Sequence, residues 1–477
     1  MKGKFKINKD KIGRLLPEIF ESRGYGKEGF NLIKNIGALA SSIDLKAFII
    51  GGFVRDVLLY SLLKDKKTFQ RYKKAKIFLK NELDLDVIVL GSAHRLTSLL
   101  SKDHPGIFKI ERIKLHKDFG TSSVVFSVNG KPLKIDFASS RTESYRSHGA
   151  LPSVNINGST LSEDVVRRDF TINTIALSLN PEDLFSLKDT AGGISDILDK
   201  KISILHDLSF NDDPTRIFRA VRFEQRLGFR ISGKTLSVMK EALNGNSMDG
   251  VSGKRIVSEF DHFFNENSPW IFFERLKKLG ALKSVHQCLS FEGINKEAFK
   301  NISMNSIRYS FGKKGSQKLF IIFMAALLCS LPPALFDDVS KRLGLDSRVK
   351  GRIYLINREI SDLEGLSMNF VKNMKGSEIY KILKKFSDEG LIYYVLREKW
   401  DKINKGIYLR EGILDYLAKI RFVKPSLTGD DLKKAGITEG KLCGQVLGEL
   451  KLLKIDGMLR TKTDELSYVL QNYGNKE

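Results

Sequence analysis

The chain contains few cysteines and histidines and no long apolar run. Among its 477 residues are seven histidines and three cysteines, Cys288, Cys329 and Cys443, which are widely spaced and form no C-x-x-C pair. This pattern excludes a disulfide framework and a cysteine-based zinc site, and it indicates a reducing, cytoplasmic environment. Residues 1–10 are rich in lysine and lack the apolar segment of a secretory signal, so we expect no export.

The longest apolar run falls short of a membrane span. Residues 319–329 form eleven consecutive apolar positions and are followed by Ser330, Leu331 and two prolines. A membrane-spanning helix needs about 20 such residues. The run therefore predicts a buried core helix, and we expect no membrane partner.

Acidic residues are outnumbered by basic ones. The chain has 80 Lys and Arg against 56 Asp and Glu, which gives a formal net charge of +24. A folded protein with such a surface field attracts polyanions, and nucleic acid before anionic membrane. The apolar fraction of 42% excludes disorder as a global description. The length predicts about three domains.

Strand and helix patterns divide the chain into two parts. Between about residues 28 and 205 the two patterns alternate, which indicates an α/β head with strands over 47–50, 85–90, 122–128 and 133–137. Asn129-Gly130 predicts a hairpin between the last two strands. From about residue 207 the pattern is helical throughout, with glycine stops at Gly228, Gly280 and Gly390. Residues 60–81, which are rich in lysine, and residues 244–253 resemble insertions or linkers.

Residues 51–56, with the sequence GGFVRD, follow the first predicted strand and precede a helix-like segment. A strand, a Gly-Gly turn and a helix N-terminus together form an anion site, to which Arg55 adds a guanidinium suited to phosphate. A tight turn with a surface arginine would have the same local sequence. The motif alone leaves both interpretations open.

Asp84 and Asp86 alternate with apolar residues in the second predicted strand, so they share one of its faces. Neighbouring carboxylates repel unless a cation lies between them. The arrangement suits two Mg²⁺ ions about 3.5–4 Å apart, which activate a hydroxyl and neutralise a triphosphate. Asp136, in the fourth strand, could face the same site. A solvated edge strand for Asp84 and Asp86, and an end-of-strand turn for Asp136, are the alternatives.

Residues 163–173, with the sequence EDVVRRDFTIN, predict a helix on which Asp169 and Asn173 share a face as residues i and i+4. A carboxylate and an amide in this arrangement can bind a ribose edge, and Arg168 can reach a neighbouring phosphate. A salt-bridge cluster at a helix N-terminus is the alternative.

Residues 212–226 begin with Asp-Asp-Pro, which marks a helix start, and carry arginines at three- and four-residue spacing. Asp213 and Arg216 can share the rim of a nucleotide pocket. A carboxylate accepts from the amino group of cytosine or adenine and a guanidinium donates to the adjacent ring nitrogen, whereas uracil and guanine offer a carbonyl at the amino position. The pair would therefore select C and A. The alternative is an exposed basic helix face formed by Arg216, Arg219, Arg222 and Arg226.

These four segments, in this order, resemble the class II tRNA nucleotidyltransferase and bacterial poly(A) polymerase family of the polymerase-β-type nucleotidyltransferase superfamily. The resemblance implies that Asp84 and Asp86 bind metal and act in catalysis with Asp136. It also implies that Asp169 selects ribose and that Asp213 and Arg216 select the base. The nucleotide-binding residues that it implies are Gly51, Gly52, Arg55, Asp56, Arg168, Asp169, Asn173, Asp213, Arg216, Arg219 and Arg222.

Two segments qualify the resemblance. Residues 212–216 match the family's E-D-x-x-R pattern with Asp212 in place of the glutamate. Arg141, Glu143 and Tyr145 lie in a segment that resembles the family's flexible region, whose residues orient the base-selecting pair. Residues 60–81 are longer than the usual link between the first two motifs. The paired-His metal domain of some relatives has no counterpart, so phosphodiesterase activity is not expected.

The resemblance covers nearly the whole chain and implies a domain order. We expect an N-terminal extension over 1–27 and a catalytic head over 28–205 with the polymerase-β-type fold. An all-α remainder follows, made of a nucleotide-selecting and RNA-binding neck over 206–270, a body over 271–405 and a tRNA-binding tail over 406–477. The fold class is thus an α/β head with a small mixed sheet, followed by helices.

The expected reaction needs no nucleic-acid template. The 3′ hydroxyl of tRNA or another RNA, deprotonated on one Mg²⁺, attacks the α-phosphate of CTP or ATP, and pyrophosphate leaves on the other ion. Enzymes that add the whole CCA end, enzymes that add only part of it and poly(A) polymerases share these motifs. The forms of residues 163–168 and 209–228 resemble relatives that add the final A.

Two rivals belong to other classes of protein. A catalytically inactive RNA-binding homologue would tolerate loss of either acid of the D-x-D motif, and all the motif acids are present. A nucleotidyltransferase for a small molecule would not need so large a basic helical half.

Overall fold

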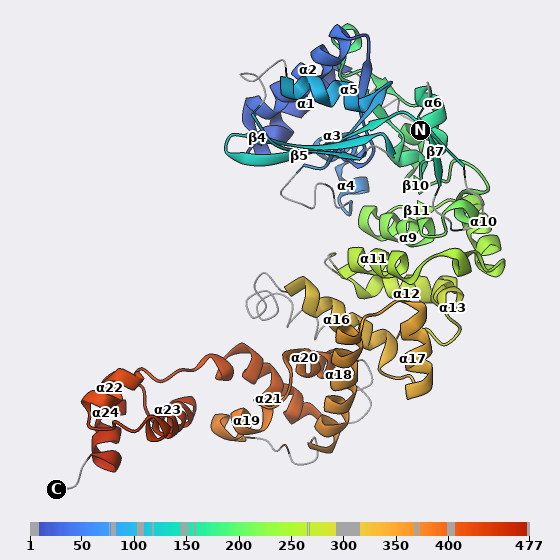
Figure 1. Ribbon diagram of the computed structural model, residues 1–477. Helices are drawn as coiled ribbons and strands as arrows, with labels where there is room; N and C mark the ends of the chain where they lie inside the picture. The colour runs from blue at the N-terminus through green and yellow to red at the C-terminus, as the bar shows by residue number, and fades with distance from the viewer. Residues whose placement is uncertain are drawn as a thin grey trace. The chain divides into compact units, whose positions relative to one another are not determined.

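A computed structural model describes residues 9–75, 77, 83–102, 109–116, 119–144, 149, 152–156, 159–264, 266, 268–291, 315–366, 370, 373–397 and 406–474. Internal contacts divide the chain into two compact units (Figure 1). Unit 1 comprises Met1–Glu259 and Lys278–Val285, and unit 2 comprises Phe260–Lys277 and His286–Glu477.

Unit 1 is built on a seven-stranded mixed sheet with the order β3-β4-β5-β2-β1-β8-β9. Strand β2 is antiparallel to β1 and parallel to β5, so it lies inside the sheet. The edge-strand alternative for Asp84 and Asp86 is therefore wrong. The strands are β1 (Lys46–Ile50), β2 (Leu85–Leu90), β3 (Ile110–His116), β4 (Thr121–Val128), β5 (Lys131–Ser139), β8 (Ala176–Ser178) and β9 (Leu187–Lys188).

The two faces of the sheet have different coverings. Helices α2 (Gly26–Ser42) and α5 (Ala93–Lys102) pack on one face, with α1 (Lys9–Ser22) against α2 (Figure 1). In β5 the buried residues Leu133, Ile135 and Phe137 alternate with Lys134 and Asp136, which leaves the second face more open. On that second face, a small cluster covers only the middle of the sheet. It consists of Phe48, Ile50, Ile88, Val165 and Ala176.

Short elements complete unit 1 after the sheet. The main ones are α6 (Leu161–Val166), the 3₁₀ turn η2 (Thr171–Asn173), α7 (Gly193–Asp199), α8 (Ser209–Asp212), α9 (Arg216–Leu227), α10 (Gly233–Asn244) and η4 (Ser247–Gly250). Helix α11 (Gly253–Phe264) contributes its residues up to Glu259. Helix α13 (Ala281–Val285) also belongs to this unit, and short strand pairs join β6 (Thr142–Ser144) to β7 (Ser153–Asn155) and β10 (Lys201–Ile202) to β11 (Arg230–Ile231).

Unit 2 is helical in its described part. Its helices are α12 (Trp270–Leu279), which belongs to this unit up to Lys277, α16 (Gly315–Leu328), α17 (Pro333–Arg342), α18 (Ser347–Leu366), α19 (Gly376–Leu383), α20 (Asp388–Leu396), α21 (Ile407–Ala418), α22 (Gly429–Lys434), α23 (Gly440–Ile455) and α24 (Lys462–Tyr473). The apolar run is buried in α16 from Ile321 to Leu328, as predicted. Helices α22, α23 and α24 bury a separate core around Leu432, Val446 and Val469.

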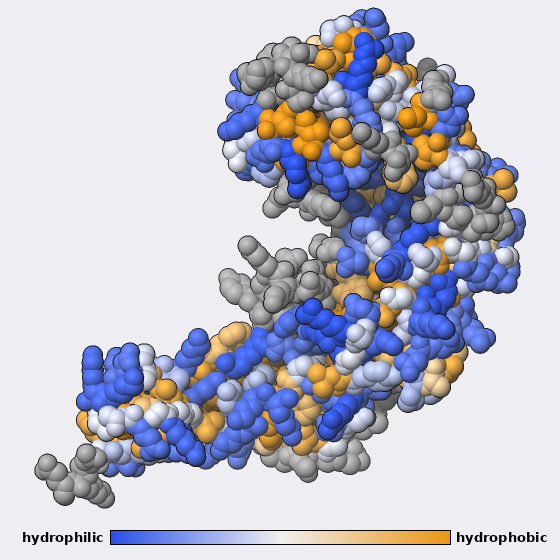
Figure 2. All heavy atoms as spheres, viewed as in Figure 1, coloured by the Kyte–Doolittle hydropathy of each residue, from blue (hydrophilic) through white to orange (hydrophobic). Residues whose placement is uncertain are grey.

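The face of the molecule shown in Figure 2 is largely hydrophilic. On the face in Figure 2, hydrophilic residues cover most of each unit and apolar residues form small patches between them. Within the described residues, no helix is both long and apolar enough to cross a bilayer.

Most sequence predictions of elements are confirmed. The four expected strands appear as β1, β2, β4 and β5, and Asn129 (φ 50°) and Gly130 (φ 72°) form the hairpin turn. Gly228 and Gly280 end helices with positive φ, but Gly390 lies in the first turn of α20, so the stop predicted there is wrong. Strand β3 was missed because it lacks a buried apolar face: Ile110 and Ile113 are only half buried, Leu115 is exposed, and Glu111, Arg112 and Lys114 are charged.

Candidate active site

The Gly-Gly turn lies against the acidic residues of the next strand. Gly51 has φ +90°, a conformation that side chains rarely adopt, and α3 (Gly52–Lys64) begins directly after it. A Cβ on Gly51 would lie 3.5 Å from Oδ2 of Asp86. The backbone of the turn therefore approaches the Asp86 carboxylate closely, and the start of a helix faces the same place.

Arg55 is not a surface residue. It is 2% exposed, and its Nε and Nη2 donate to Oδ1 of Asp56 at 2.9 and 2.7 Å. Its Nη1 donates to Oδ1 of Asn173 at 2.7 Å. The surface-arginine alternative is wrong, and Arg55 joins the Gly-Gly segment to the segment that was expected to bind ribose.

Asp84 and Asp86 share the open face of the sheet, as the alternation predicted. Both are exposed, whereas Leu85 and Val87 between and after them are buried. The register places Asp86 beside Ile50 of β1 and beside Asp136 of β5. Asp136 therefore faces the same site, within a strand rather than in a turn at its end.

The charges around Asp86 shift its titration. Its side chain reaches solvent, but surrounding protein partly desolvates the carboxylate. This burial, followed by the negative charge of Asp84, raises the pKa of Asp86 to about 6. Arg168 opposes the shift, Asp136 adds to it, and Lys134 opposes it least. Asp136 differs from Asp86 in its hydrogen bonds. Lys134 Nζ and Ser123 Oγ donate to its two carboxylate oxygens.

A cleft of about 400 Å³ lies over these acids. Besides Asp86 and Asp136, its lining includes His116, Ser123, Arg167 and Arg168. The sequence reasoning missed His116, which ends the unpredicted strand β3, and Ser123, whose position on the open face follows from the alternation in β4. The cleft thus combines carboxylates with guanidinium groups, as a site for phosphates and cations requires.

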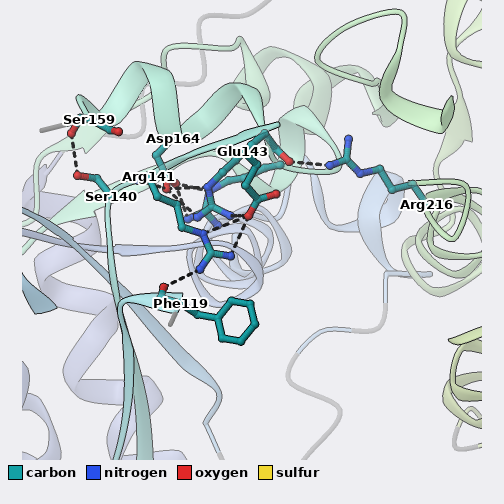
Figure 3. Close-up of polar contacts among 9 residues, drawn as sticks. Phe119, Ser140, Arg141, Glu143, Ser159, Asp164 and Arg216 are labelled. Carbon is teal, nitrogen blue, oxygen red and sulfur yellow. Dashed lines mark hydrogen bonds and ion pairs between the residues drawn. The ribbon is translucent and has the colours of Figure 1, made fainter. Parts of the chain in front are cut away.

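The two cleft arginines are fixed by a buried carboxylate (Figure 3). Asp164 is fully buried; its Oδ1 accepts from Arg167 Nε and Nη2 at 2.9 and 2.7 Å, and its Oδ2 accepts from Arg168 Nε and Nη2 at 3.1 and 2.9 Å. Glu143 Oε1 accepts from Arg141 Nη2 at 2.8 Å and from Arg167 Nη1 at 3.0 Å. Breaking a buried pair of this kind costs about 3–5 kcal/mol, so the arginines are held in place.

The continuous helix predicted over 163–173 is wrong. Helix α6 ends at Val166, Phe170 is extended and fully buried, and Asn173 lies in the turn η2. The burial of Phe170 outweighs the helical pattern. The expected pairing survives, because Asn173 Nδ2 donates to Oδ1 of Asp169 at 3.0 Å.

Asp169 is held in its charged form. Burial opposes its ionisation, but the positive charge of Arg219 and the hydrogen bonds from Asn173, Arg219 and the Phe170 backbone hold its pKa at about 2. Arg219 Nε and Nη2 donate to Oδ2 of Asp169 at 2.9 and 2.7 Å.

The arginines of α9 do not form an exposed basic face. Arg219 pairs with Asp169, Arg226 Nη2 lies 3.6 Å from Asp56, and Arg222 Nη1 lies 3.9 Å from Glu259. Burial and the neighbouring Arg219 lower the pKa of Arg222 to about 10. Arg219, Arg222 and Arg226 thus face acidic residues from three other segments, so the alternative of a solvated helix face is wrong.

Asp213 and Arg216 lie at the start of α9 and are both engaged. Oδ1 of Asp213 accepts from Thr215 Oγ1 at 2.6 Å and from Arg255 Nη2 at 2.7 Å. Arg216 is 5% exposed; its Nη1 donates to Ser209 Oγ at 2.7 Å and its Nη2 donates to the Arg167 carbonyl at 2.6 Å (Figure 3).

The structure thus joins residues that are far apart in the sequence. Contacts run from Asp56 through Arg55, Asn173 and Asp169 to Arg219. Arg255, at the start of α11, was missed because nothing in its local sequence signals a contact with Asp213. Tyr145 lies outside the described residues.

The acids present fit a divalent cation. Within the described residues, no group of three or more His, Cys, Asp or Glu side chains is arranged to hold a metal ion. Mg²⁺ needs no such group, because it commonly binds through one or two carboxylates together with substrate phosphates and water. Asp84 and Asp86 supply that number. Burial, and then the negative charge of Asp84, raise the pKa of Asp86, and a bound cation would favour its charged form.

Comparisons with known proteins agree on one family. Residues 47–203 match the poly A polymerase head domain. The chain is 32% identical to the A-adding tRNA nucleotidyltransferase of Geobacter sulfurreducens over 91% of its length, and 26% identical to that of Halalkalibacterium halodurans over 94%. It spans 46% of the Geobacter protein, about half of its length, and 93% of the Halalkalibacterium protein.

A solved structure extends the likeness to the fold. The Thermotoga maritima CCA-adding enzyme, complexed with tRNA, has a TM-score of 0.64 and 27% identity, and the match covers 92% of this chain and 94% of that one.

Cation binding should depend on pH through Asp86. Because its pKa is raised to about 6, the carboxylate is protonated below that pH and a cation must displace the proton. Calorimetric titration of Mn²⁺ in buffers of different ionisation enthalpy should show release of about half a proton at pH 6 and almost none at pH 8. Affinity should rise with pH up to about 6 and then level off.

The Asp86→Asn variant should lose this proton release. Asp183→Asn is the matched control, since the Asp183 carboxylate pairs with Lys188 and does not line the cleft. Equal proton release from wild type and Asp86→Asn would contradict the assignment.

Proposed function

We propose that the chain is a class II tRNA nucleotidyltransferase that transfers AMP from ATP to the 3′ end of tRNA with release of pyrophosphate. The observation that carries the proposal is the 3.5 Å approach of the Gly51 position to the Asp86 carboxylate, at the edge of a cleft lined by Arg167 and Arg168. A helix start, paired acids and fixed guanidinium groups meet there, which suits a nucleoside triphosphate.

The acids are proposed to hold Mg²⁺. Nucleotidyltransferases of this family generally use a divalent metal, and Asp84 and Asp86 are its proposed ligands here, with Asp136 beside them. When bound, the metal supplies the lowered pKa of the attacking 3′ hydroxyl and the neutralisation of charge on the triphosphate. Lys134 and Ser123 hold the Asp136 carboxylate next to Asp86.

The arginines are proposed to bind phosphates. Arg167 and Arg168 are pre-positioned by Asp164, so little side-chain entropy is lost when a ligand arrives. Arg222 Nε is buried and has no hydrogen-bond partner among the described residues, which leaves a donor for the nucleotide. Gly51, Gly52, Arg55, Asp56, Asn173 and Arg219 are proposed to shape the same nucleotide site.

Choice of sugar and base is proposed to rest on Asp169, Asp213 and Arg216. Asp169 stays ionised and accepts hydrogen bonds, so it can accept another from a ribose hydroxyl. A guanidinium has five N–H donors, so the contacts of Arg216 with Ser209 and Arg167 leave others for a base. Asp213 would accept from the amino group of adenine or cytosine.

The two related products differ in how many nucleotides are added. The A-adding relatives and the forms of residues 163–168 and 209–228 favour addition of the final A. The fold of the Thermotoga enzyme favours addition of the whole CCA end as the second candidate. We also propose domain boundaries at residues 27, 205, 270 and 405. A cytoplasmic location is part of the same proposal and is consistent with the free cysteines Cys288, Cys329 and Cys443.

Three RNA transcripts distinguish these activities. One ends before CCA, one ends after CC, and one has a generic 3′ end, and each is offered with one nucleotide at a time. We expect AMP on the transcript that ends in CC and little product elsewhere. A CMP ladder on the first transcript would favour CCA addition, and long adenosine tails on the third would favour a poly(A) polymerase.

The Asp86→Asn variant should lose AMP incorporation but still bind tRNA. Removal of one metal-binding carboxylate should lower AMP incorporation to below about one thousandth of wild type, equivalent to several kcal/mol of transition-state stabilisation. Binding of tRNA, measured by filter retention, should persist, and Asp183→Asn should behave as wild type. Substantial turnover by Asp86→Asn would refute the metal assignment.

The Arg216→Ala variant should discriminate less strongly between ATP and UTP. A good guanidinium-to-base contact contributes about 1–3 kcal/mol of discrimination, so the ratio of kcat/KM for ATP to that for UTP should fall by about 10- to 100-fold. Arg255→Gln, which frees Asp213, should lower the same ratio to a smaller extent, and Lys254→Gln, a neighbouring exposed residue, should not. An unchanged ratio in Arg216→Ala would remove the base-selecting role.

A further inference from the structure

Residues 64–75 form the described start of the segment that is longer than expected between the first two motifs. They contain six basic residues and one acidic residue. Helix α4 (Phe69–Tyr72) lies within them. Six of its exposed residues define the insertion surface: Lys66, Lys67, Phe69, Arg71, Lys73 and Lys74.

The insertion surface is fixed to the body of unit 1. Tyr72 is 1% exposed, and its hydroxyl donates to the carbonyls of Ile197 and Leu198 at 3.2 and 2.9 Å, at the end of α7. Lys200 Nζ donates to the Arg71 carbonyl at 3.1 Å. The buried ring and these bonds hold the neighbouring cations in set positions, which a solvated loop would not do.

Among the described residues, no acidic side chain pairs with the lysines of the insertion surface. Lys64 pairs with Glu18, but no ion pair joins Lys66, Lys67, Lys73 or Lys74 to an acid within the described residues. Burial and the positive charges of Arg71 and Lys74 lower the pKa of Lys200. By contrast, Arg219, Arg222 and Arg226 each face a carboxylate. Unlike the arginines of α9, these four lysines therefore face no carboxylate in the part of the chain that the structure describes.

An exposed aromatic ring and the end of α9 lie beside these lysines. Phe69 is 45% exposed, although a large apolar side chain in a packed segment is usually buried. A Cβ on Gly228, which ends α9, would lie 3.3 Å from Cβ of Lys74. The insertion surface therefore touches the helix that carries Arg216 at its other end.

We propose that the insertion surface binds backbone phosphates of the RNA substrate, with Phe69 available to stack on an unpaired base. Fixed lysines and arginines around an exposed aromatic ring are the usual chemistry of a sequence-independent RNA contact. The identity of the RNA as tRNA rests on the proposed function, whereas the phosphate contact does not. The surface adds affinity for RNA and has no part in choosing the nucleotide.

The test compares two variants that each lose four lysine charges, one at the insertion surface and one at a different surface of the protein. The variant K66Q/K67Q/K73Q/K74Q alters the insertion surface, and K9Q/K27Q/K34Q/K46Q removes the same charge from exposed lysines of α1, α2 and the start of β1. The dissociation constant for tRNA ending in CC is measured from 50 to 300 mM salt, together with kcat and KM for AMP addition.

The insertion variant should bind tRNA about tenfold or more weakly at low salt, and its slope of log affinity against log salt should shrink by about 2–4, because each phosphate contact contributes about one unit. KM for tRNA should rise while kcat stays unchanged. The control should match wild type, and the conservative variant K66R/K67R/K73R/K74R should keep wild-type affinity.

Equal affinity and equal salt slopes in the insertion variant and the control would overturn the proposal, provided both unfold at the wild-type temperature. Loss of binding to anionic vesicles with tRNA binding intact would also overturn it, in favour of a membrane role. A wild type that binds tRNA but adds no nucleotide would refute the proposed function and leave the binding comparison decisive for the surface.

Discussion

The site depends on the repulsion between carboxylates held side by side on an inner strand. Because β2 lies between β1 and β5, the positions of Asp86 and Asp136 are set by backbone pairing, and neither side chain can move far from the other. The pKa of Asp86 is raised first by burial, and the negative charges of Asp84 and Asp136 add to this effect. Such a cost of ionising a carboxylate persists in a fold when a ligand relieves it, and a divalent cation with a triphosphate would do so. The Gly51 turn, which needs no side chain, leaves room beside the acids.

Around this centre, the arginines are paired with carboxylates from distant segments. Asp164 fixes Arg167 and Arg168, and Asp169 fixes Arg219. Since exposed ion pairs stabilise a fold by about 1 kcal/mol or less, the burial of these pairs is what makes them rigid. The Arg167 carbonyl also accepts from Arg216, so the residues proposed to bind phosphate and those proposed to select the base share one hydrogen-bonded network. The lysines of the insertion surface contrast with this network, because no carboxylate pairs with Lys66, Lys67, Lys73 or Lys74 in the described ranges of the chain.

Local patterns predicted the strands and the shared face of Asp84 and Asp86, because alternation with a period of two follows from strand geometry alone. The same reasoning allowed Asp136 to face that site, and the strand register places it beside Asp86. It failed where tertiary packing decides: Phe170 is buried and breaks the expected helix before Asn173, and the arginine stripe of α9 is covered by acids that the sequence keeps far away. Arg255 could not be found, since its contact with Asp213 joins residues 42 apart.

The most direct measurement of the central claim is anomalous diffraction from crystals grown with Mn²⁺ and an ATP analogue that cannot release pyrophosphate. The account predicts a Mn²⁺ peak at the carboxylates of Asp84 and Asp86, with phosphate oxygens of the analogue completing its coordination. An ordered analogue in the cleft with no peak at these two residues, or a peak held by other side chains, would contradict it.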